Sequence, residues 1–296
     1  MRLPDDFHFS QGSLQDYVEC PRRFQLLRLM RLAWPAIITE PPLDNERFLK
    51  QGAAFHRLLQ QHLLGVQVEC LDQMEMDSEL RQWWQNYLHA QPDPQGGLPE
   101  GLAAELNGPG KLCLTEISLS VPLCNYRLVG KFDALVLSRS EAGASIKIFE
   151  WKTSHKRDSA KKLAERLQTR VYPYLLVRAS ECFTEGLGLH PEQVEMIYWF
   201  AGFPGRAQRY TYDQDSYRLD SLYLEGLVAE IETRLESDFP LAPGSKTCRW
   251  CTYRSLCERG VRAGTLDDDE ADIEAGLAGE EAETGFNFEQ IGEISF

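Results

Sequence analysis

The segment "IFEWKTS" at residues 148–154 places a glutamate and a lysine in a short apolar strand. Because side chains alternate across a strand, Glu150 and Lys152 share one face, while Phe149 and Trp151 point to the other. The two charged groups therefore converge where the strand ends. This spacing fits a salt bridge on a half-exposed strand and a catalytic site equally well.

The surrounding sequence predicts the elements on which this strand lies. Segments of strand composition cover residues 111–123, 126–138, 145–152, 193–200 and 207–212. Helices are expected at 46–64, 77–90, about 156–180 and 214–237. An earlier helix would be capped near Ser13, with Asp16 three residues later, and Pro21 would kink or restart it. This order predicts an α/β fold with a mixed sheet flanked by helices and a helical N-terminal part.

Composition narrows the class of protein. The 296 residues suit one large domain or two small ones. The start of the sequence, "MRLPDDFHFS", has no apolar core of a signal peptide. No stretch approaches the roughly 20 apolar residues that span a bilayer. We therefore expect a cytoplasmic protein that has no membrane partner.

The net charge of −14 is concentrated at one end of the chain. Residues 263–296 contain eleven acidic and no basic side chains, which leaves a charge of −3 for residues 1–262. The body of the protein can therefore still bind phosphates through local basic patches. The acidic segment is expected to be a disordered tail, and the alternative is that it occupies a basic channel or a partner groove.

A second carboxylate, Asp133, lies on the strand before Glu150 and Lys152. Two carboxylates can hold a divalent metal, and a lysine can orient or deprotonate the attacking water or offset charge in the transition state. These groups together could hydrolyse a phosphodiester. The alternative is a cross-strand salt bridge among Lys131, Asp133 and Lys152. Glu116, on the first strand of this group, could lie near the metal or could be an ordinary solvated glutamate.

Three of the eight cysteines form the pattern C-x₂-C-x₅-C at Cys248, Cys251 and Cys257. A closed tetrahedral site needs a fourth ligand, and Cys20 in "ECPRRF" is the candidate. Spacing alone does not choose between zinc and an iron–sulfur cluster. The remaining cysteines are isolated and are expected to be small core or surface residues: Cys70, Cys113, Cys124 and Cys182.

Six motifs together resemble the PD-(D/E)XK nuclease superfamily, and within it the RecB-like branch that has a four-cysteine iron–sulfur cluster. That branch includes AddB-type recombination nucleases and CRISPR-adaptation nucleases. The motifs are "SLQDYVECPRRF" (13–24), "GAAFHRLL" (52–59), "GKFDAL" (130–135), "FEWKT" (149–153), "QTRVY" (168–172) and "CRWCTYRSLC" (248–257). Each motif is weak alone, but the six occur in the family's order.

The resemblance implies a restriction-endonuclease-like fold and assigns roles within it. Asp133 and Glu150 would be acidic ligands of Mg²⁺ or Mn²⁺, His56 would be a further ligand, and Lys152 would be the catalytic lysine. Outside this context, His56 would be interpreted as an ordinary helix histidine.

The resemblance also assigns two positions on the helix after the active-site strand. Gln168 and Tyr172 would position the substrate, with a surface glutamine and a packed tyrosine as the alternative. The same segment is rich in basic residues that could bind a phosphate backbone: Lys156, Arg157, Lys161, Lys162, Arg166, Arg170 and Arg178.

For the cysteines, the resemblance favours a 4Fe–4S cluster held by Cys20, Cys248, Cys251 and Cys257, with zinc as the alternative. The cluster would fasten the two ends of a nuclease domain at residues 1–262. Its helical part would be 13–107 and its core 111–240, followed by the cysteine segment 248–257 and the tail 263–296.

The function expected from these features is a metal-dependent DNA nuclease. The resemblance suggests an exonuclease that acts on single-stranded DNA or DNA ends, in DNA repair and recombination or in CRISPR adaptation. The sequence has no G-x-x-x-x-G-K-[ST] motif, so any unwinding would come from a separate helicase or other protein of the pathway. Two alternatives are a non-catalytic DNA-binding or scaffold subunit and a zinc-stapled interaction protein.

Overall fold

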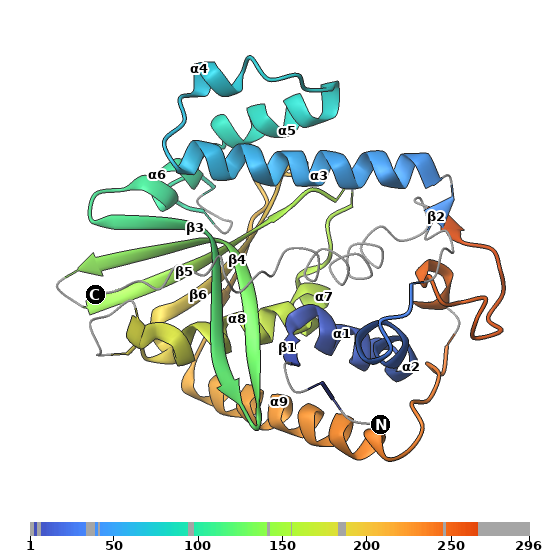
Figure 1. Ribbon diagram of the computed structural model, residues 1–296. Coiled ribbons are helices and arrows are strands. Elements are labelled where there is room, and N and C mark those ends of the chain that lie inside the picture. The colour runs from blue at the N-terminus through green and yellow to red at the C-terminus, as the bar shows by residue number, and fades with distance from the viewer. Residues whose placement is uncertain are drawn as a thin grey trace. The chain divides into compact units, whose positions relative to one another are not determined.

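Residues 111–152 form three consecutive strands, as the sequence predicts. They are β3 (Lys111–Leu123), β4 (Tyr126–Ser140) and β5 (Gly143–Lys152) (Figure 1). β3 pairs with β4, and β4 pairs antiparallel with β5 in a register that runs from Ala134–Phe149 to Ser140–Gly143. The computed structural model describes residues 3–4, 7–33, 39–40, 42–93, 98–140, 143–154, 156–182, 188–244 and 247–265.

Two further strands make the sheet a mixed one. β6 (Val194–Phe200) is parallel to β5, and β7 (Gln208–Thr211) is antiparallel to β6. Parallel neighbours require a crossover connection. Here it contains α7 (Ala160–Glu165), α8 (Leu167–Ala179) and the short 3-10 turns Ser180–Cys182 and Pro191–Gln193. The expected α/β architecture with a mixed sheet flanked by helices is thereby confirmed.

The crossover differs from the single helix expected over about 156–180. Arg166 adopts an extended backbone (φ −67°, ψ 139°), which ends α7 and begins α8. The guanidinium of Arg166 lies 2.6 Å from Asp158. Thr169 Oγ1 donates to the carbonyl of Leu163 across the break. The Leu163 carbonyl, which a continuous helix would pair with a backbone amide in the next turn, therefore has a partner at the break.

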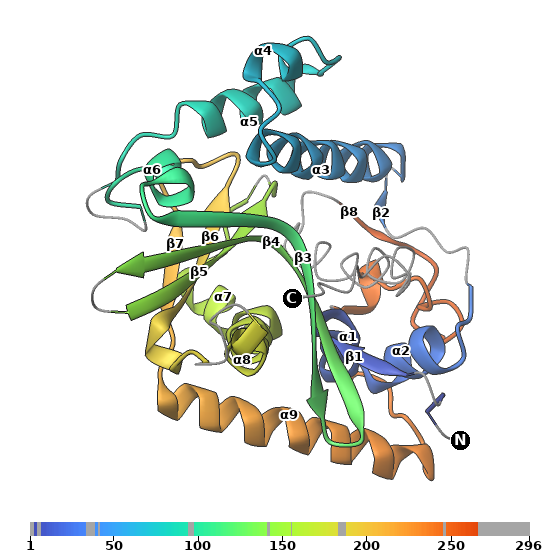
Figure 2. The same cartoon turned by 60° about the vertical axis from the view of Figure 1, so that its left-hand side comes forward.

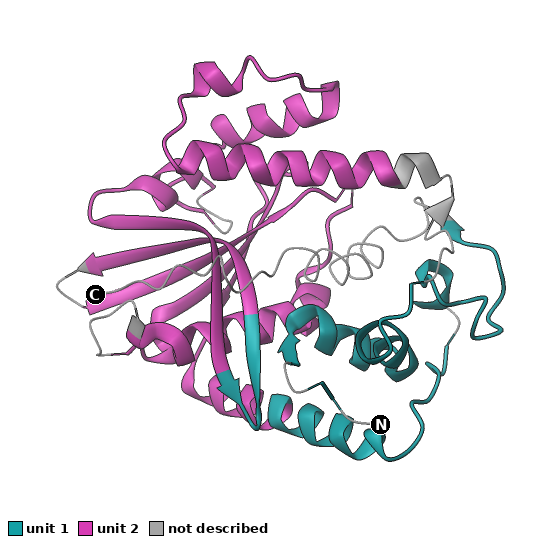
Figure 3. Ribbon diagram, viewed as in Figure 1, with its two compact units in different colours: residues 1–45, 122–129, 224–296 teal, residues 46–121, 130–223 magenta. Residues whose placement is uncertain are grey.

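The chain divides into two compact units (Figure 3). Unit 1 contains residues 1–45, 122–129 and 224–296, and unit 2 contains residues 46–121 and 130–223. The strand that carries "IFEWKTS" belongs to unit 2.

In unit 2, the sheet has helices on both faces (Figure 2). One face is covered by α3 (Pro42–Leu63), and α8 lies on the other. The remaining helices of this unit are α4 (Val68–Leu71), α5 (Ser78–Leu88) and α6 (Leu102–Asn107).

An aromatic core fills the side of the sheet beneath α3 and α5. Phe149 and Trp151 belong to it, as the alternation along β5 predicts. Trp151 packs edge-on against Tyr87 and Trp199, with ring centroids 6.4 and 6.1 Å apart. Phe55 of α3 stacks on Trp199 at 6.2 Å. The apolar face of β5 is therefore fixed by large, rigid side chains.

Unit 1 combines the N-terminal helices with the C-terminal segment. Its elements are β1 (His8–Ser10), α1 (Gln11–Glu19), α2 (Pro21–Phe24), a π-helical turn (Gln25–Leu29), β2 (Thr39–Glu40), the second half of α9 (Gln214–Leu235), a 3-10 turn (Thr247–Trp250) and β8 (Gly264–Thr265). β1 runs parallel to residues 127–129 of β4, and β2 runs parallel to β8. Pro21 restarts the helix at its first position.

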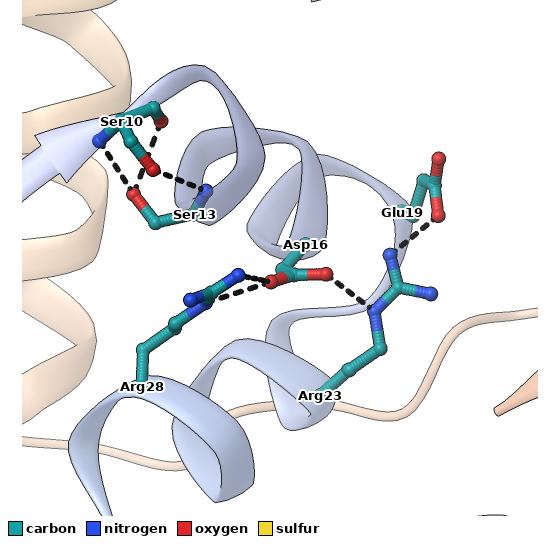
Figure 4. Close-up of polar contacts among 6 residues, drawn as sticks. All are labelled: Ser10, Ser13, Asp16, Glu19, Arg23 and Arg28. Atoms are coloured by element: carbon teal, nitrogen blue, oxygen red, sulfur yellow. Dashed lines mark hydrogen bonds and ion pairs between the residues drawn. The ribbon is translucent and has the colours of Figure 1, made fainter. Parts of the chain in front are cut away.

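The cap of α1 differs from the sequence expectation. Ser10 is the N-cap, and Ser13 lies three residues later (Figure 4). The Ser13 amide donates to Ser10 Oγ at 3.1 Å, and the Ser10 amide donates to Ser13 Oγ at 2.9 Å. The serine expected to be the cap is therefore the second member of a reciprocal capping pair.

Asp16 is the centre of a buried ionic network rather than a capping residue (Figure 4). Its Oδ2 lies 2.8 Å from both Nε and Nη2 of Arg28, and its Oδ1 lies 2.8 Å from Arg23 Nε. Arg23 Nη2 also contacts Glu19 at 2.5 Å. Asp16 and Arg28 are only 1% and 2% exposed, so this carboxylate offsets two buried positive charges.

Replacing Asp16 by alanine is expected to destabilise the protein by about 3–5 kcal/mol, because it removes the shared partner of two buried guanidiniums. The measurement is the urea midpoint followed by circular dichroism. Glu46→Gln is the matched control, since it breaks the exposed pair with Lys50 and should leave the midpoint unchanged. Equal midpoints for Asp16→Ala and the wild type would contradict a stabilising role for this network.

The expectation for the acidic tail reaches beyond the described residues, whereas the expectation for a membrane span can be compared with the described helices. Of the tail at 263–296, only residues 263–265 are described, so the expected disorder of the rest lies outside the structure's description. No described helix combines the length and apolarity that crossing a membrane requires.

Candidate functional site

Asp133 lies where the pairing of β4 with β5 ends. The last regular pair is Ala134–Phe149, so the Trp151 amide lies beyond the paired region. This amide donates to Asp133 Oδ2 at 2.8 Å. A backbone N–H that has lost its strand partner needs another acceptor, and the Asp133 side chain supplies it. The other carboxylate oxygen, Oδ1, lies 3.1 Å from His56 Nδ1.

A close approach of α3 to the end of β5 brings His56 to this position. Gly52 lies one helical turn before His56, and a Cβ atom built on it would be 3.1 Å from Thr153 Oγ1. Glycine therefore lets the helix pack closer than a larger residue would. A similar approach occurs at Gly130, whose Cβ would be 3.2 Å from Leu175 of α8. The glycines of "GAAFH" and "GKFD" thus have a steric explanation.

Glu116 completes a group of three potential metal ligands. One ligand atom each of His56, Glu116 and Asp133 lies within 4.8 Å of the others. Glu116 has a left-handed backbone (φ 55°) within β3, a conformation that is uncommon outside glycine. Such a residue interrupts the alternation of a strand and redirects its side chain. The face of Glu116 therefore could not be read from simple alternation with its neighbours.

Glu150 lies beside this group in a buried position. Its Oε2 accepts a hydrogen bond from Gln168 Nε2 at 2.7 Å, while its Oε1 is buried and has no hydrogen-bond partner among the described residues. Burial, and after it the negative charge of Asp133, raises the pKa of Glu150 well above its ordinary value. A buried carboxylate oxygen without a partner is costly, so this atom is a natural ligand for a cation.

The pKa shifts of His56 and Asp133 favour an ion pair between them. Burial opposes the charged form of His56, but Asp133 outweighs it and raises the pKa of His56. Burial likewise opposes the charged form of Asp133, while His56 and the Trp151 amide hold the pKa of Asp133 below its ordinary value. A metal ion binds only neutral imidazole, so an ion that bound here would take the place of the histidine proton.

Lys152 and Tyr172 have different surroundings. Lys152 is 9% exposed, and its ammonium lies 5.8 Å from the ring centre of Tyr198. Tyr172 donates to the backbone carbonyl of Lys131 at 2.9 Å and packs on Phe132 with ring centroids 4.7 Å apart. Burial, and after it Glu150 and Asp133, raises the pKa of Tyr172 well above its ordinary value.

The expected site residues therefore gather in unit 2 with two differences from the ligand set His56, Asp133 and Glu150. Glu116 joins the close group of three, and Glu150 lies outside it. The salt bridge expected for Lys131 was with Asp133, whereas its ammonium is paired with Glu116. The sequence signal that could have revealed a role for Lys131 at this site is spacing: the lysine lies two residues before Asp133 on the same strand, so the two side chains share a face.

Several basic residues of the crossover are already paired within the chain. Lys162 and Arg166 contact Asp158, Lys161 contacts Glu165, and Arg170 contacts Asp220. The contacts of Arg166 with Asp158 and of Arg170 with Asp220 are the shortest, at 2.6 Å each. A phosphate backbone that used these side chains would have to compete with those carboxylates.

Most of the chain matches a known protein family. The profile of the PD-(D/E)XK nuclease superfamily matches residues 8–258. The chain belongs to this superfamily. No curated protein matches the sequence. Among solved structures, the chain resembles a Eubacterium rectale protein provisionally named an exonuclease, with 9% identity, a TM-score of 0.42, and coverage of 80% of this chain and 87% of that one. A likeness this distant adds nothing to the family match.

A second cluster of potential ligands lies in unit 1 of this PD-(D/E)XK protein. Cys20 stands between α1 and α2 in an extended conformation. Burial is the main reason that the pKa of Cys248, Cys251 and Cys257 is raised, to about 11 for Cys251, and the charge of Cys20 raises each pKa further. Cys20 is thus an electrostatic neighbour of all three, although it is more than 220 residues away in the sequence.

The remaining cysteines have the expected surroundings where they are described. Cys70 and Cys124 are exposed, and Cys113 is half-buried. The side chain of Cys182 lies outside the described residues.

The role of Gly52 can be tested with an alanine substitution. Gly52→Ala should push α3 away from Thr153, separate His56 from Asp133 and weaken Mn²⁺ binding by roughly tenfold. Stability should change little, because the roughly 1 kcal/mol by which alanine favours a helix over glycine offsets the cost of displacing α3. Calorimetric Mn²⁺ titration and thermal unfolding measure the two effects.

The matched control for this substitution is Gly226→Ala on α9, where an added Cβ has no atom within 4 Å. It should bring the same gain in helix propensity without any loss of Mn²⁺ affinity. Wild-type affinity in Gly52→Ala would mean that the glycine does not set the position of His56.

Proposed function

We propose that this protein is a divalent-metal-dependent nuclease that hydrolyses DNA phosphodiesters. The observation that carries the proposal is the convergence of His56, Glu116 and Asp133 within 4.8 Å, next to Glu150 Oε1, which has no hydrogen-bond partner in the part of the chain that the structure describes. Lys152 lies two residues from Glu150 at the end of the same strand. Membership of the PD-(D/E)XK superfamily supports the same conclusion.

The donor set fits Mg²⁺ or Mn²⁺. Carboxylate oxygens from Asp133, Glu150 and Glu116 suit hard cations, and the imidazole of His56 is a ligand that Mn²⁺ tolerates well. When bound, the ion would lower the pKa of a water molecule and neutralise charge on the phosphate. A cation would also supply the partner that the buried Glu150 Oε1 lacks.

The protein's own groups would hold this site in shape and handle the proton. The Trp151 amide fixes Asp133, and Gln168 fixes Glu150 by hydrogen bonds of 2.8 and 2.7 Å. Lys152 would orient the attacking water or accept its proton at Nζ, and its positive charge would offset charge that develops on the phosphate. Tyr172 would act indirectly, because its hydroxyl binds the backbone of β4 next to Asp133.

The activity can be tested on end-labelled single- and double-stranded DNA with Mg²⁺ or Mn²⁺. Asp133→Ala and Lys152→Met should each lower the cleavage rate by roughly 10²–10³-fold, as expected when one stabilising group is removed from an active site. Glu165→Gln is a control on the exposed surface of α7 and should cleave like the wild type. A labelled product that shortens progressively from one end would identify an exonuclease.

Two outcomes would contradict the proposal. If the wild type binds DNA without cleaving it in either metal, the protein is a DNA-binding or scaffold subunit. If Asp133→Ala cleaves as fast as the wild type, the activity belongs to another site or to a contaminant.

We further propose that Cys20, Cys248, Cys251 and Cys257 hold a 4Fe–4S cluster. Their mutual electrostatic influence supports a shared site. Tetrahedral zinc, with Zn–S bonds of about 2.3 Å, would hold its sulfurs about 3.8 Å apart. A four-iron cluster separates its thiolates more widely.

The cluster assignment predicts a brown protein with broad visible absorbance after anaerobic purification. Cys251→Ser should lose most of this absorbance and unfold at a lower temperature, since cluster binding contributes to folding. Cys70→Ser replaces an exposed cysteine and should change neither property. A colourless wild type that contains stoichiometric zinc would overturn the assignment and favour a zinc-stapled protein.

The biological setting follows from the resemblance of the six motifs to the RecB-like branch. We propose that the protein trims single-stranded DNA or DNA ends during DNA repair and recombination or CRISPR adaptation. A separate helicase or another protein of the pathway would supply the substrate strand.

A further inference from the structure

Lys131 forms an ion pair with Glu116, one of the three clustered ligands. Lys131 precedes Asp133 by two residues on β4, and its carbonyl accepts the hydroxyl of Tyr172. The Lys131 side chain is 57% exposed, whereas that of Glu116 is 19% exposed. A mobile cation from the protein therefore binds the carboxylate that a metal ion would also bind.

The two partners differ in their freedom to move. Glu116 is the more buried partner, with 19% of its side chain exposed, and its left-handed backbone lies inside β3. Lys131 has four rotatable carbons and a strongly hydrated ammonium at the protein surface. When a divalent ion binds Glu116, the positive ion and the ammonium repel each other across a few ångströms. Lys131 is the partner that can leave.

The released ammonium would stay near the phosphodiester. Lys131 and Asp133 are on the same strand face, so the lysine remains within one side-chain length of the metal ligands. A nucleic acid strand at this site presents phosphate oxygens, and lysine binds them as a point charge. The exchange leaves the lysine charge neutralised in both states, first by a carboxylate and then by a phosphate.

We propose that Lys131 is a metal-dependent phosphate-binding residue. It neutralises Glu116 while no divalent ion is bound, and it turns to a DNA phosphate once Glu116 binds the ion. This inference rests on the proposed nuclease function, because it assumes that a metal and DNA bind at this site. It predicts that metal and DNA binding reinforce each other through one side chain.

The test compares Lys131→Gln with the wild type in two binding measurements. In the first, Mn²⁺ is titrated calorimetrically into the protein without DNA. Lys131→Gln should bind Mn²⁺ roughly two- to fivefold more tightly, since it removes a cation that competes for Glu116. In the second, the affinity for a labelled oligonucleotide is measured over a range of salt concentrations, in EDTA and in Ca²⁺, with the DNA checked for cleavage.

In Ca²⁺, Lys131→Gln should bind DNA several-fold more weakly, and the slope of log affinity against log salt should fall by about one. In EDTA, the substitution should leave both the DNA affinity and its salt slope unchanged, because Lys131 is then paired with Glu116 and does not contact a phosphate. Lys131→Arg keeps the charge and should retain the wild-type slope in Ca²⁺. The matched control is Lys161→Gln, which removes the same charge from an exposed pair with Glu165. Any effect of this control should be the same in EDTA and in Ca²⁺.

The outcomes separate this inference from the function on which it rests. Unchanged Mn²⁺ affinity, or a DNA effect of Lys131→Gln that is equal in EDTA and Ca²⁺, overturns the role of Lys131 while the nuclease remains. A wild type that binds neither Mn²⁺ nor Ca²⁺ at this site overturns the proposed function itself. Loss of the Ca²⁺-dependent slope in Lys131→Arg would also contradict a charge-based exchange.

Discussion

The site depends on the carboxylate of Asp133, which is held from two directions. One oxygen accepts the amide of Trp151 at 2.8 Å, and the other lies 3.1 Å from the imidazole of His56. The first contact ties the end of β5 to β4 after the regular strand pairing has stopped. The second ties α3 to the same point. A strand, a neighbouring strand and a helix thus meet at one side chain, and the positions of the other ligands follow from this arrangement.

Trp151 links this polar contact to the hydrophobic core. Its ring packs against Tyr87 and Trp199, while its backbone amide serves Asp133. Because a strand directs side chains and backbone groups in different directions, one residue can belong to both environments. The aromatic core restrains the ring and therefore the amide, so the rigidity of the site is derived from apolar packing on the opposite side of the strand.

Much of this arrangement was predictable from local patterns. The strands at residues 111–152 and the separation of Phe149 and Trp151 from Glu150 follow from alternation of polar and apolar residues. The clustering of His56 with Asp133 required the family resemblance, because the two residues are 77 positions apart and nothing local relates them. The assignment of Ser13 as the cap of α1 was wrong. Ser10 and Ser13 form a reciprocal capping pair, and because both are serines the sequence does not show which of them is the N-cap. The helix break at Arg166 was missed because no glycine or proline marks it.

Glu116 shows why the remainder could not be predicted. Alternation assigns a face to every residue of a regular strand, but a single left-handed residue breaks the alternation for its own side chain. Glutamate pays a conformational cost there that glycine would avoid, and such strain persists only where the surroundings enforce it. The contacts that surround Glu116 are the ion pair with Lys131 and the approach of His56 and Asp133.

Two acidic side chains, Glu116 and Asp133, repel each other unless cations lie between them. Lys131 supplies one such cation in the protein alone, and the raised pKa of His56 favours a second; a divalent ion would take over this balance of charge.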